Sequence, residues 1–249
     1  MKKTILFKHN QIAYESVLQM FEYEDKVAVV HPTGTGKSFI GFQLCMDHPL
    51  SKICWLSPSE YIFNTQIENF ISVGGAELRN VEFYTYAKLM LMSDNELLKI
   101  QPQYIILDEF HRCGAQIWGA GVRVVLDTYP NIPVLGLTAT NIRYLDNQRD
   151  IAQELFDGCI ASEMTLGEAI VRGILPKPKY VTTVFKYHQS LDQYQQRILN
   201  LRVPALRDAN QVYYDALRRA LEQADGLDVV LKKHITNKTG KYLLFCSDF

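Results

Sequence analysis

The stretch KVAVVHPTGTGKSF, residues 26–39, constrains the fold of this 249-residue chain more than any other feature. Its apolar and β-branched beginning predicts a buried strand, and the residues from Lys37 onward predict a helix. Gly34 and Gly36 lie between the two, where glycine lets backbone N–H groups turn toward a bound anion because it has no Cβ. A strand, a glycine-rich turn and a helix in this order predict a phosphate-binding loop.

The loop residues indicate what such a site would hold. In the pattern G-x-x-x-x-G-K-[ST], the lysine reaches the β- and γ-phosphates of a nucleotide and the hydroxyl joins the shell of Mg²⁺. His31 stands where this pattern has its first glycine, and we expect it to be a strand-end side chain rather than a catalytic base. The predicted nucleotide-binding residues of the loop are Thr33, Gly34, Thr35, Gly36, Lys37 and Ser38.

Short apolar runs alternate with helical patterns along the first half of the chain. We predict strands at residues 26–31, 52–57, 81–86, 103–109 and 133–140. Near-continuous apolar strands separated by helices predict a parallel sheet that is covered on both faces. In such sheets ligands bind at the carboxyl ends of the strands, and the polar motifs of this chain all fall there. The predicted fold class is α/β, a parallel sheet of the P-loop NTPase type flanked by helices.

The segment IILDEFH places two carboxylates at the end of one predicted strand. In P-loop enzymes an acidic residue at this place holds Mg²⁺. A second carboxylate beside it can orient or deprotonate the attacking water. We therefore predict Asp108 and Ser38 as metal ligands. The predicted catalytic residues are Glu109 and Lys37.

Three segments together resemble a known family. HPTGTGKS, LDEFH and GLTAT, in this order and at this spacing, resemble motifs I, II and III of superfamily 2 helicases and translocases. LDEFH resembles the DEAH box with Phe110 in place of alanine. Residues 155–181 resemble the end of the first motor domain in relatives of restriction-enzyme motor subunits. The resemblance covers residues 5 to about 185 and implies a RecA-like motor domain that uses ATP and Mg²⁺ and acts on nucleic acid, DNA more than RNA.

The same resemblance implies further site residues. Gln11 resembles a glutamine that recognises adenine. The residues implied to link the phosphate state to the grip on nucleic acid are His111, Thr138 and Thr140. The residues implied to contact the nucleic-acid backbone, without reading its sequence, are Ser57, Pro58 and Thr85. We expect Trp55 to belong to the core rather than to a platform for base stacking.

The character of the sequence changes after Pro178. We expect residues 1–185 to form the motor domain, residues 186–238 a helical connector, and residues 239–249 the first strand of a second motor domain. In this superfamily that second domain supplies the arginine fingers of phosphoryl transfer, and it is expected to be missing from this chain. The fragment is therefore expected to bind ATP–Mg²⁺ weakly and to hydrolyse it slowly. The alternative is an ATP-binding scaffold without motor activity. A P-loop kinase fits poorly, because LDEFH and LTAT would have no role in such an enzyme.

Composition limits the remaining classes. The formal net charge is −1, so a nucleic-acid site must be a local groove rather than a general positive field. The five cysteines are scattered without a C-x-x-C pair, as in reduced intracellular proteins. No apolar run approaches the ~20 residues of a membrane span, and the N-terminus lacks a signal-peptide pattern. We expect a cytoplasmic protein without membrane contact, and the sequence does not indicate an oligomeric state.

Overall fold

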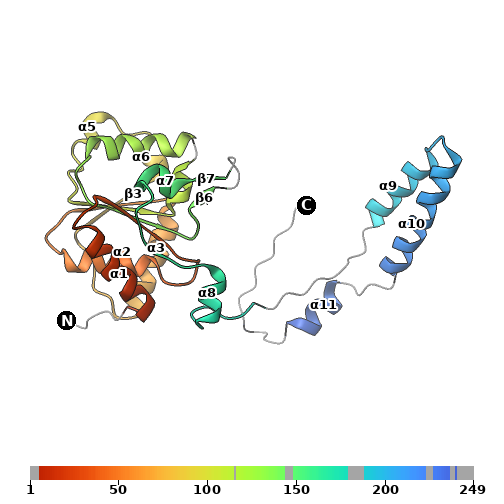
Figure 1. The fold of residues 1–249 in the computed structure, drawn as a ribbon, viewed down its shortest axis with the longest axis horizontal. Helices are drawn as coiled ribbons and strands as arrows, with labels where there is room; N and C mark the ends of the chain where they lie inside the picture. Colours follow the sequence, from red (N-terminus) through yellow and green to blue (C-terminus); the bar gives the residue numbers. More distant parts are fainter. Residues whose placement is uncertain are drawn as a thin grey trace. The chain divides into compact units, whose positions relative to one another are not determined.

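The computed structural model describes residues 6–114, 116–143, 148–178, 188–222, 227–235 and residue 239. The chain divides into two compact units, Met1–Lys177 and Pro178–Phe249. The first unit holds the sheet and every residue predicted for the site, and the described part of the second unit is helical (Figure 1).

The first unit is built on a six-stranded sheet in the order β3-β2-β4-β5-β1-β8. All of its strand pairs are parallel. The strands are β1 (Lys26–Val30), β2 (Ile53–Ser57), β3 (Val81–Thr85), β4 (Tyr104–Asp108), β5 (Val134–Thr138) and β8 (Ile160–Glu163). The predicted parallel α/β sheet and its five predicted strands are confirmed. A two-stranded antiparallel ribbon, β6 (Ile142–Arg143) and β7 (Arg149–Asp150), follows β5.

The observed strands are one to three residues shorter than the predicted ones, and the sheet has a strand that was not predicted. The predicted third strand ends one residue early, because the Thr85 hydroxyl accepts a hydrogen bond from the N–H of Lys88 and starts a helix at Tyr86. The edge strand β8 was not predicted. It has only four residues, which are half-buried or exposed, so it lacks the continuous apolar run that marks the inner strands.

Helices cover both faces of this sheet. The helices of the first unit are α1 (Lys8–Met20), α2 (Ser38–Asp47), α3 (Glu60–Ser72), α4 (Tyr86–Leu89), α5 (Asp94–Leu97), α6 (Gln116–Thr128), α7 (Ile151–Phe156) and α8 (Leu166–Val171), with a 3₁₀ turn at Phe110–Gly114. One core cluster unites α1, α2 and α3 with one face of the strands. A second cluster unites α4, α5, α6 and α7 with the other face, as the two layers in Figure 1 show.

Strand β1 shows why the central runs are almost wholly apolar. Ala28 and Val30 pack into one core cluster, whereas Val27 and Val29 pack into the other. Each of these side chains has an exposed fraction of at most 4%. A strand that is covered on both faces has no polar side, so its sequence does not alternate.

The glycine of GLTAT is required by packing beneath the site. A Cβ on Gly136 would lie 2.2 Å from Cζ of Phe156 and 2.9 Å from Cδ1 of Phe110. The two rings pack with their centroids 4.8 Å apart, and both are buried. The bulk of Phe110, where the DEAH box has alanine, is therefore accommodated under β5 rather than in the site.

The second unit contains α9 (His188–Leu199), α10 (Pro204–Glu222) and α11 (Leu227–His234). Helices α9 and α10 pack together, and the hydroxyl of Tyr194 donates to Oδ1 of Asn210 at 3.1 Å. The expected first strand of a second motor domain, at 239–249, lies outside the described residues except for residue 239. Among the described helices, none combines the length and the apolar composition that crossing a membrane requires.

Candidate nucleotide-binding site

The loop between β1 and α2 has the backbone that the glycines predict. Gly34 has a φ of 90° and Gly36 a φ of 81°, both in the left-handed region that favours glycine. A Cβ on Gly36 would also lie 2.9 Å from Nδ2 of Asn10. Lys37 caps helix α2, which begins at Ser38, so the N-terminal end of that helix meets the loop.

Two residues of α1 that the sequence analysis missed hold this loop. Nδ2 of Asn10 donates to the carbonyl oxygens of Thr35 at 2.9 Å and of Gly36 at 3.1 Å. Nε2 of His9 lies 2.8 Å from the same oxygen of Thr35. These bonds fix the peptide planes of the two residues that precede Lys37. Helix α1 thus holds the predicted phosphate loop in its conformation.

A signal for Asn10 was present in the sequence. Asn10 shares the buried face of α1 with Ala13, Tyr14 and Val17, at the helical spacing of three and four residues. A polar side chain in such an apolar stripe needs a partner, and here the loop carbonyls provide it. Gln11, which the family resemblance selected, is exposed, and its amide donates to Oε1 of Glu15 at 3.0 Å.

The acidic pair and the loop lysine meet at the carboxyl edge of the sheet. Nζ of Lys37 forms an ion pair of 3.0 Å with Oε1 of Glu109. Glu109 has a φ of 54°, a left-handed backbone that is uncommon outside glycine, so its surroundings hold it there. Asp108, the last residue of β4, is fully buried, and its Oδ2 accepts a hydrogen bond of 3.2 Å from Nε2 of Gln66.

The two carboxylates have opposite electrostatic environments. Burial, together with the negative charge of Glu109, raises the pKa of Asp108 to about 6, against the opposing effects of Lys37 and Gln66. Burial would also raise the pKa of Glu109, but the hydrogen bond to His111 and the charge of Lys37 outweigh it and lower that pKa to about 2. Adjacent acids with such different environments indicate different roles.

The pKa of Asp108 predicts an unusual effect of Asp108→Asn on stability. A carboxyl whose pKa is higher in the folded state than in the unfolded state binds its proton more tightly when folded. The free energy of unfolding therefore decreases as the pH rises from about 4 to about 6. Without metal or nucleotide, Asp108→Asn is expected to raise the free energy of unfolding at pH 7.5 by roughly 1–3 kcal/mol. Urea unfolding at pH 5 and pH 7.5 checks this.

Glu109→Gln is the matched control for this measurement. The lowered pKa of Glu109 stabilises the fold above about pH 4.5, and this stabilisation is lost as the pH falls toward 2. Its amide variant is therefore expected to unfold at lower urea concentration than the wild type at pH 7.5. A loss of stability in Asp108→Asn equal to that in Glu109→Gln would contradict the different environments of the two carboxylates.

The predicted coupling residues form one connected chain. The hydroxyl of Thr138 donates to the carbonyl oxygen of Thr140 at 2.8 Å, so it accepts from Nδ1 of His111, which lies 2.8 Å away. Nδ1 of His111 therefore carries a proton. The same nitrogen lies 3.4 Å from Oε2 of Glu109, which joins the acidic pair to the end of β5.

His31 is a strand-end residue with a structural contact. It is fully buried, and its Nε2 lies 2.9 Å from Oγ of Ser162 on β8. Burial, followed by electrostatic interaction with His9, Arg172 and Lys37, lowers the pKa of His31 to about 4, so this ring is neutral at pH 7. His31 ties the start of the loop to the edge strand.

The residues predicted to contact nucleic acid lie at the ends of β2 and β3. Because Leu56 pairs with Leu107, Ser57 lies beside the end of β4, which carries Asp108. Ser57 is fully buried, Pro58 is half-buried, and the hydroxyl of Thr85 caps α4. Trp55 is fully buried and stacks on Phe42 with a centroid separation of 4.9 Å, so its predicted place in the core is confirmed.

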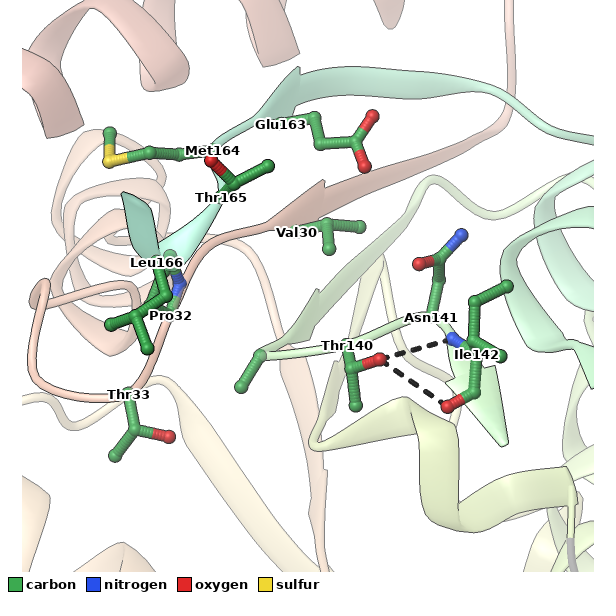
Figure 2. A pocket seen from close by; sticks show the side chains of 11 residues that line it. Val30, Pro32, Thr33, Thr140, Asn141, Ile142, Glu163, Met164, Thr165 and Leu166 are labelled. Atoms are coloured by element: carbon green, nitrogen blue, oxygen red, sulfur yellow. Dashed lines mark hydrogen bonds between the residues drawn. The ribbon is translucent and has the colours of Figure 1, made fainter. Parts of the chain in front are cut away.

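A cavity of about 620 Å³ opens beside the loop, between the ends of β1 and β5 and the turn from β8 to α8 (Figure 2). Thr33 of the loop and Thr140 of the coupling chain both line it. The hydroxyl of Thr140 is engaged by the backbone of Ile142, with O···N and O···O distances of 3.3 Å. A predicted loop residue and a predicted coupling residue thus line the same cavity.

The chemistry of the donor set fits Mg²⁺. Oδ1 of Asp108 is buried and has no hydrogen-bond partner among the described residues, and Ser38 stands at the start of α2. In the part of the chain that the structure describes, there is no group of three or more His, Cys, Asp or Glu side chains able to hold a metal. Mg²⁺ is usually held by one or two carboxylates together with substrate phosphates, so this sparse set suits it.

The glycine loop after β1, the acidic pair after β4 and the paired threonines after β5 all follow strands of the parallel sheet. The domain is RecA-like and of the superfamily 2 helicase type. Residues 3–143, more than half of the chain, match the family model described as "Type III restriction enzyme, res subunit". The chain belongs to this family.

Solved structures share the fold at low sequence identity. The ATP-dependent Type ISP restriction-modification enzyme LlaBIII bound to DNA matches with a TM-score of 0.56 and 18% identity, over 80% of this chain and 17% of that one. The Hef helicase domain of Pyrococcus furiosus matches with a TM-score of 0.52 and 15% identity, over 86% of this chain and 56% of that one. The chain thus spans less than two thirds of either protein. No curated protein matches the sequence.

Proposed function

We propose that this chain is the ATP-binding part of a helicase or translocase that moves along nucleic acid. The observation that carries the proposal is the ion pair of 3.0 Å between Lys37 and Glu109, next to Asp108, whose Oδ1 has no hydrogen-bond partner within the described ranges. All three groups lie at the carboxyl edge of the sheet, next to a glycine loop with the backbone that phosphate binding needs. A buried lysine, a base and a metal ligand are the parts that phosphoryl transfer uses.

The ion pair suggests how ATP would prepare the site. A triphosphate on the loop offers Lys37 oxygen atoms that compete with Glu109, so Lys37 would turn from the carboxylate to the β- and γ-phosphates. Glu109 would then be free to orient or deprotonate the attacking water. Asp108 and Ser38 would hold Mg²⁺, which would neutralise charge on the phosphoryl oxygens when bound. Gln11 is the proposed contact to adenine, and the backbone from Thr33 to Gly36 the proposed phosphate cradle.

The contacts that link Glu109, His111 and Thr138 suggest how hydrolysis would change the structure away from the phosphates. Nδ1 of His111 lies near both Oε2 of Glu109 and the hydroxyl of Thr138. A change in the charge around Glu109 would therefore change the hydrogen bond between His111 and Thr138. Because Thr138 bonds to the backbone of Thr140, that change would reach the segment after β5. We propose that this segment transmits the phosphate state to the grip on nucleic acid.

For the nucleic acid itself we propose DNA before RNA. One structural neighbour is described as bound to DNA, and the family is named for restriction enzymes. The proposed contacts of Ser57, Pro58 and Thr85 are to the backbone, through the strand ends that carry them. We further propose that residues 1–185 act as the first motor domain, residues 186–238 as connector, and residues from 239 as the start of a second motor domain.

Two assays on the 249-residue chain separate a motor domain from an ATP-binding scaffold. Calorimetry with Mg·ATP measures binding, and phosphate release on the same sample measures turnover. We expect binding with slow release, and faster release once the second motor domain supplies its arginine. Binding without release in both forms would favour the scaffold, and the absence of any binding would refute the proposed function.

A further inference from the structure

Gln66 is not among the predicted site residues, yet it contacts Asp108, the proposed metal ligand. It lies on α3, and its Nε2 donates to Oδ2 of Asp108 at 3.2 Å. An ionised carboxylate only accepts hydrogen bonds, so the amide presents its NH₂ group to Asp108. The amide oxygen of Gln66 is therefore not engaged by this bond to Asp108.

Rigid packing holds Gln66 in this position. Phe63 and Phe70 of the same helix are buried in the core, three residues before and four residues after Gln66. The helix begins at a cap in which the hydroxyl of Ser59 accepts from the N–H of Ile62 at 3.2 Å. Gln66 is thus a polar residue within an apolar stripe, on an element fixed at its start and along its length.

Two oxygen atoms of the Gln66–Asp108 pair lack a donor. Oδ1 of Asp108 and Oε1 of Gln66 are both buried, and neither has a hydrogen-bond partner among residues that the structure describes. Buried acceptors are normally satisfied, so two unsatisfied ones on adjoining side chains point to a ligand that the chain does not supply. A hydrated divalent cation suits both, because the ion binds carboxylate oxygen and its water molecules donate to neutral acceptors.

We propose that Gln66 is a positioning residue for the Mg²⁺ site. Its NH₂ group holds one oxygen of Asp108 and leaves the other for the ion, and its amide oxygen serves as an acceptor for the water of the hydrated ion. This rests on the proposed function, because it takes Asp108 as the metal ligand. Loss of such a second partner typically lowers metal affinity by about 10- to 100-fold.

The test measures metal binding rather than activity. Mn²⁺ replaces Mg²⁺ as a probe visible by electron paramagnetic resonance, and the 249-residue chain carries the non-hydrolysable analogue AMP-PNP. Gln66→Leu and Gln66→Met, which keeps the side-chain length, are expected to weaken Mn²⁺ binding by about tenfold or more. The affinity for AMP-PNP in EDTA is expected to stay within twofold of the wild type, and a purely structural role would lower it as well.

Gln43→Leu is the matched control. Its Nε2 donates to Oδ1 of Asp47 at 2.8 Å, so this variant removes the same type of amide–carboxylate bond at the far end of α2. It is expected to bind Mn²⁺ like the wild type. Unchanged Mn²⁺ affinity in folded Gln66→Met would overturn the role of Gln66. A loss of AMP-PNP affinity in EDTA as large as the loss of Mn²⁺ affinity would overturn it as well. Failure of the wild type itself to bind Mn²⁺ with AMP-PNP would overturn the proposed function and this inference together.

Discussion

Replacing Lys37 with alanine is expected to weaken binding of Mg·ATP to this chain by about 100-fold. A hydrogen bond between charged groups contributes about 1.5–3 kcal/mol, and Lys37 is the buried cation of the loop, with an exposed side-chain fraction of 8%. The variant also leaves Glu109 without its ion-pair partner, so the negative charge near the phosphates is no longer balanced. Calorimetry with Mg·ATP measures the change in affinity.

Lys52→Ala is the control for this variant. Lys52 also forms an ion pair with a glutamate, at 2.9 Å from Glu82, but both side chains are more than one third exposed and the pair lies away from the loop. Such surface pairs contribute little to stability, so this variant is expected to bind ATP like the wild type. Equal ATP affinity in Lys37→Ala and the wild type would mean that the loop does not bind the triphosphate.

Replacing Glu109 with glutamine is expected to lower ATP turnover by about 10²- to 10⁴-fold, the usual contribution of a general base. Binding of ATP is expected to be no weaker than in the wild type, because the variant removes the carboxylate that competes with the phosphates for Lys37. The split between lost turnover and retained binding distinguishes a base from a residue that only shapes the site. Phosphate release and calorimetry on one preparation measure both quantities.

Glu82→Gln serves as the control, since it removes the acidic partner of the exposed pair with Lys52. Its turnover and binding are both expected to match the wild type. Wild-type turnover in Glu109→Gln would refute the catalytic role of Glu109. Equal losses of ATP binding and turnover in that variant would instead mean that Glu109 only maintains the structure of the site.

The sheet was predictable because burial on both faces leaves a plain mark in the sequence. Strands such as β1 and β4 are nearly continuous apolar runs that end in a polar motif. Strand β8 left no such mark, because an edge strand of four half-exposed residues carries no apolar run. The place of Asp108 and Glu109 followed from the same rule, since both come at a strand end.

The supporting residues of the site were less predictable. Asn10, His9 and Gln66 act across distances in the chain of 25, 26 and 42 residues, which local spacing does not reveal. All three are polar side chains on the inner face of an amphipathic helix. Such a position indicates that the side chain needs a hydrogen-bond partner, but it does not indicate which residue the partner is. The structure names the partners as the loop carbonyls and the carboxylate of Asp108.

If this chain is part of an ATP-driven nucleic-acid motor, DNA should stimulate its ATP hydrolysis. The rate of phosphate release from ATP is compared with and without duplex DNA, in a form of the protein that includes the second motor domain. DNA is expected to raise the rate by about tenfold or more, within the usual range of coupling between two sites, and Glu109→Gln is expected to abolish this increase. An equal rate with and without DNA, and with RNA in its place, would contradict the proposed motor function.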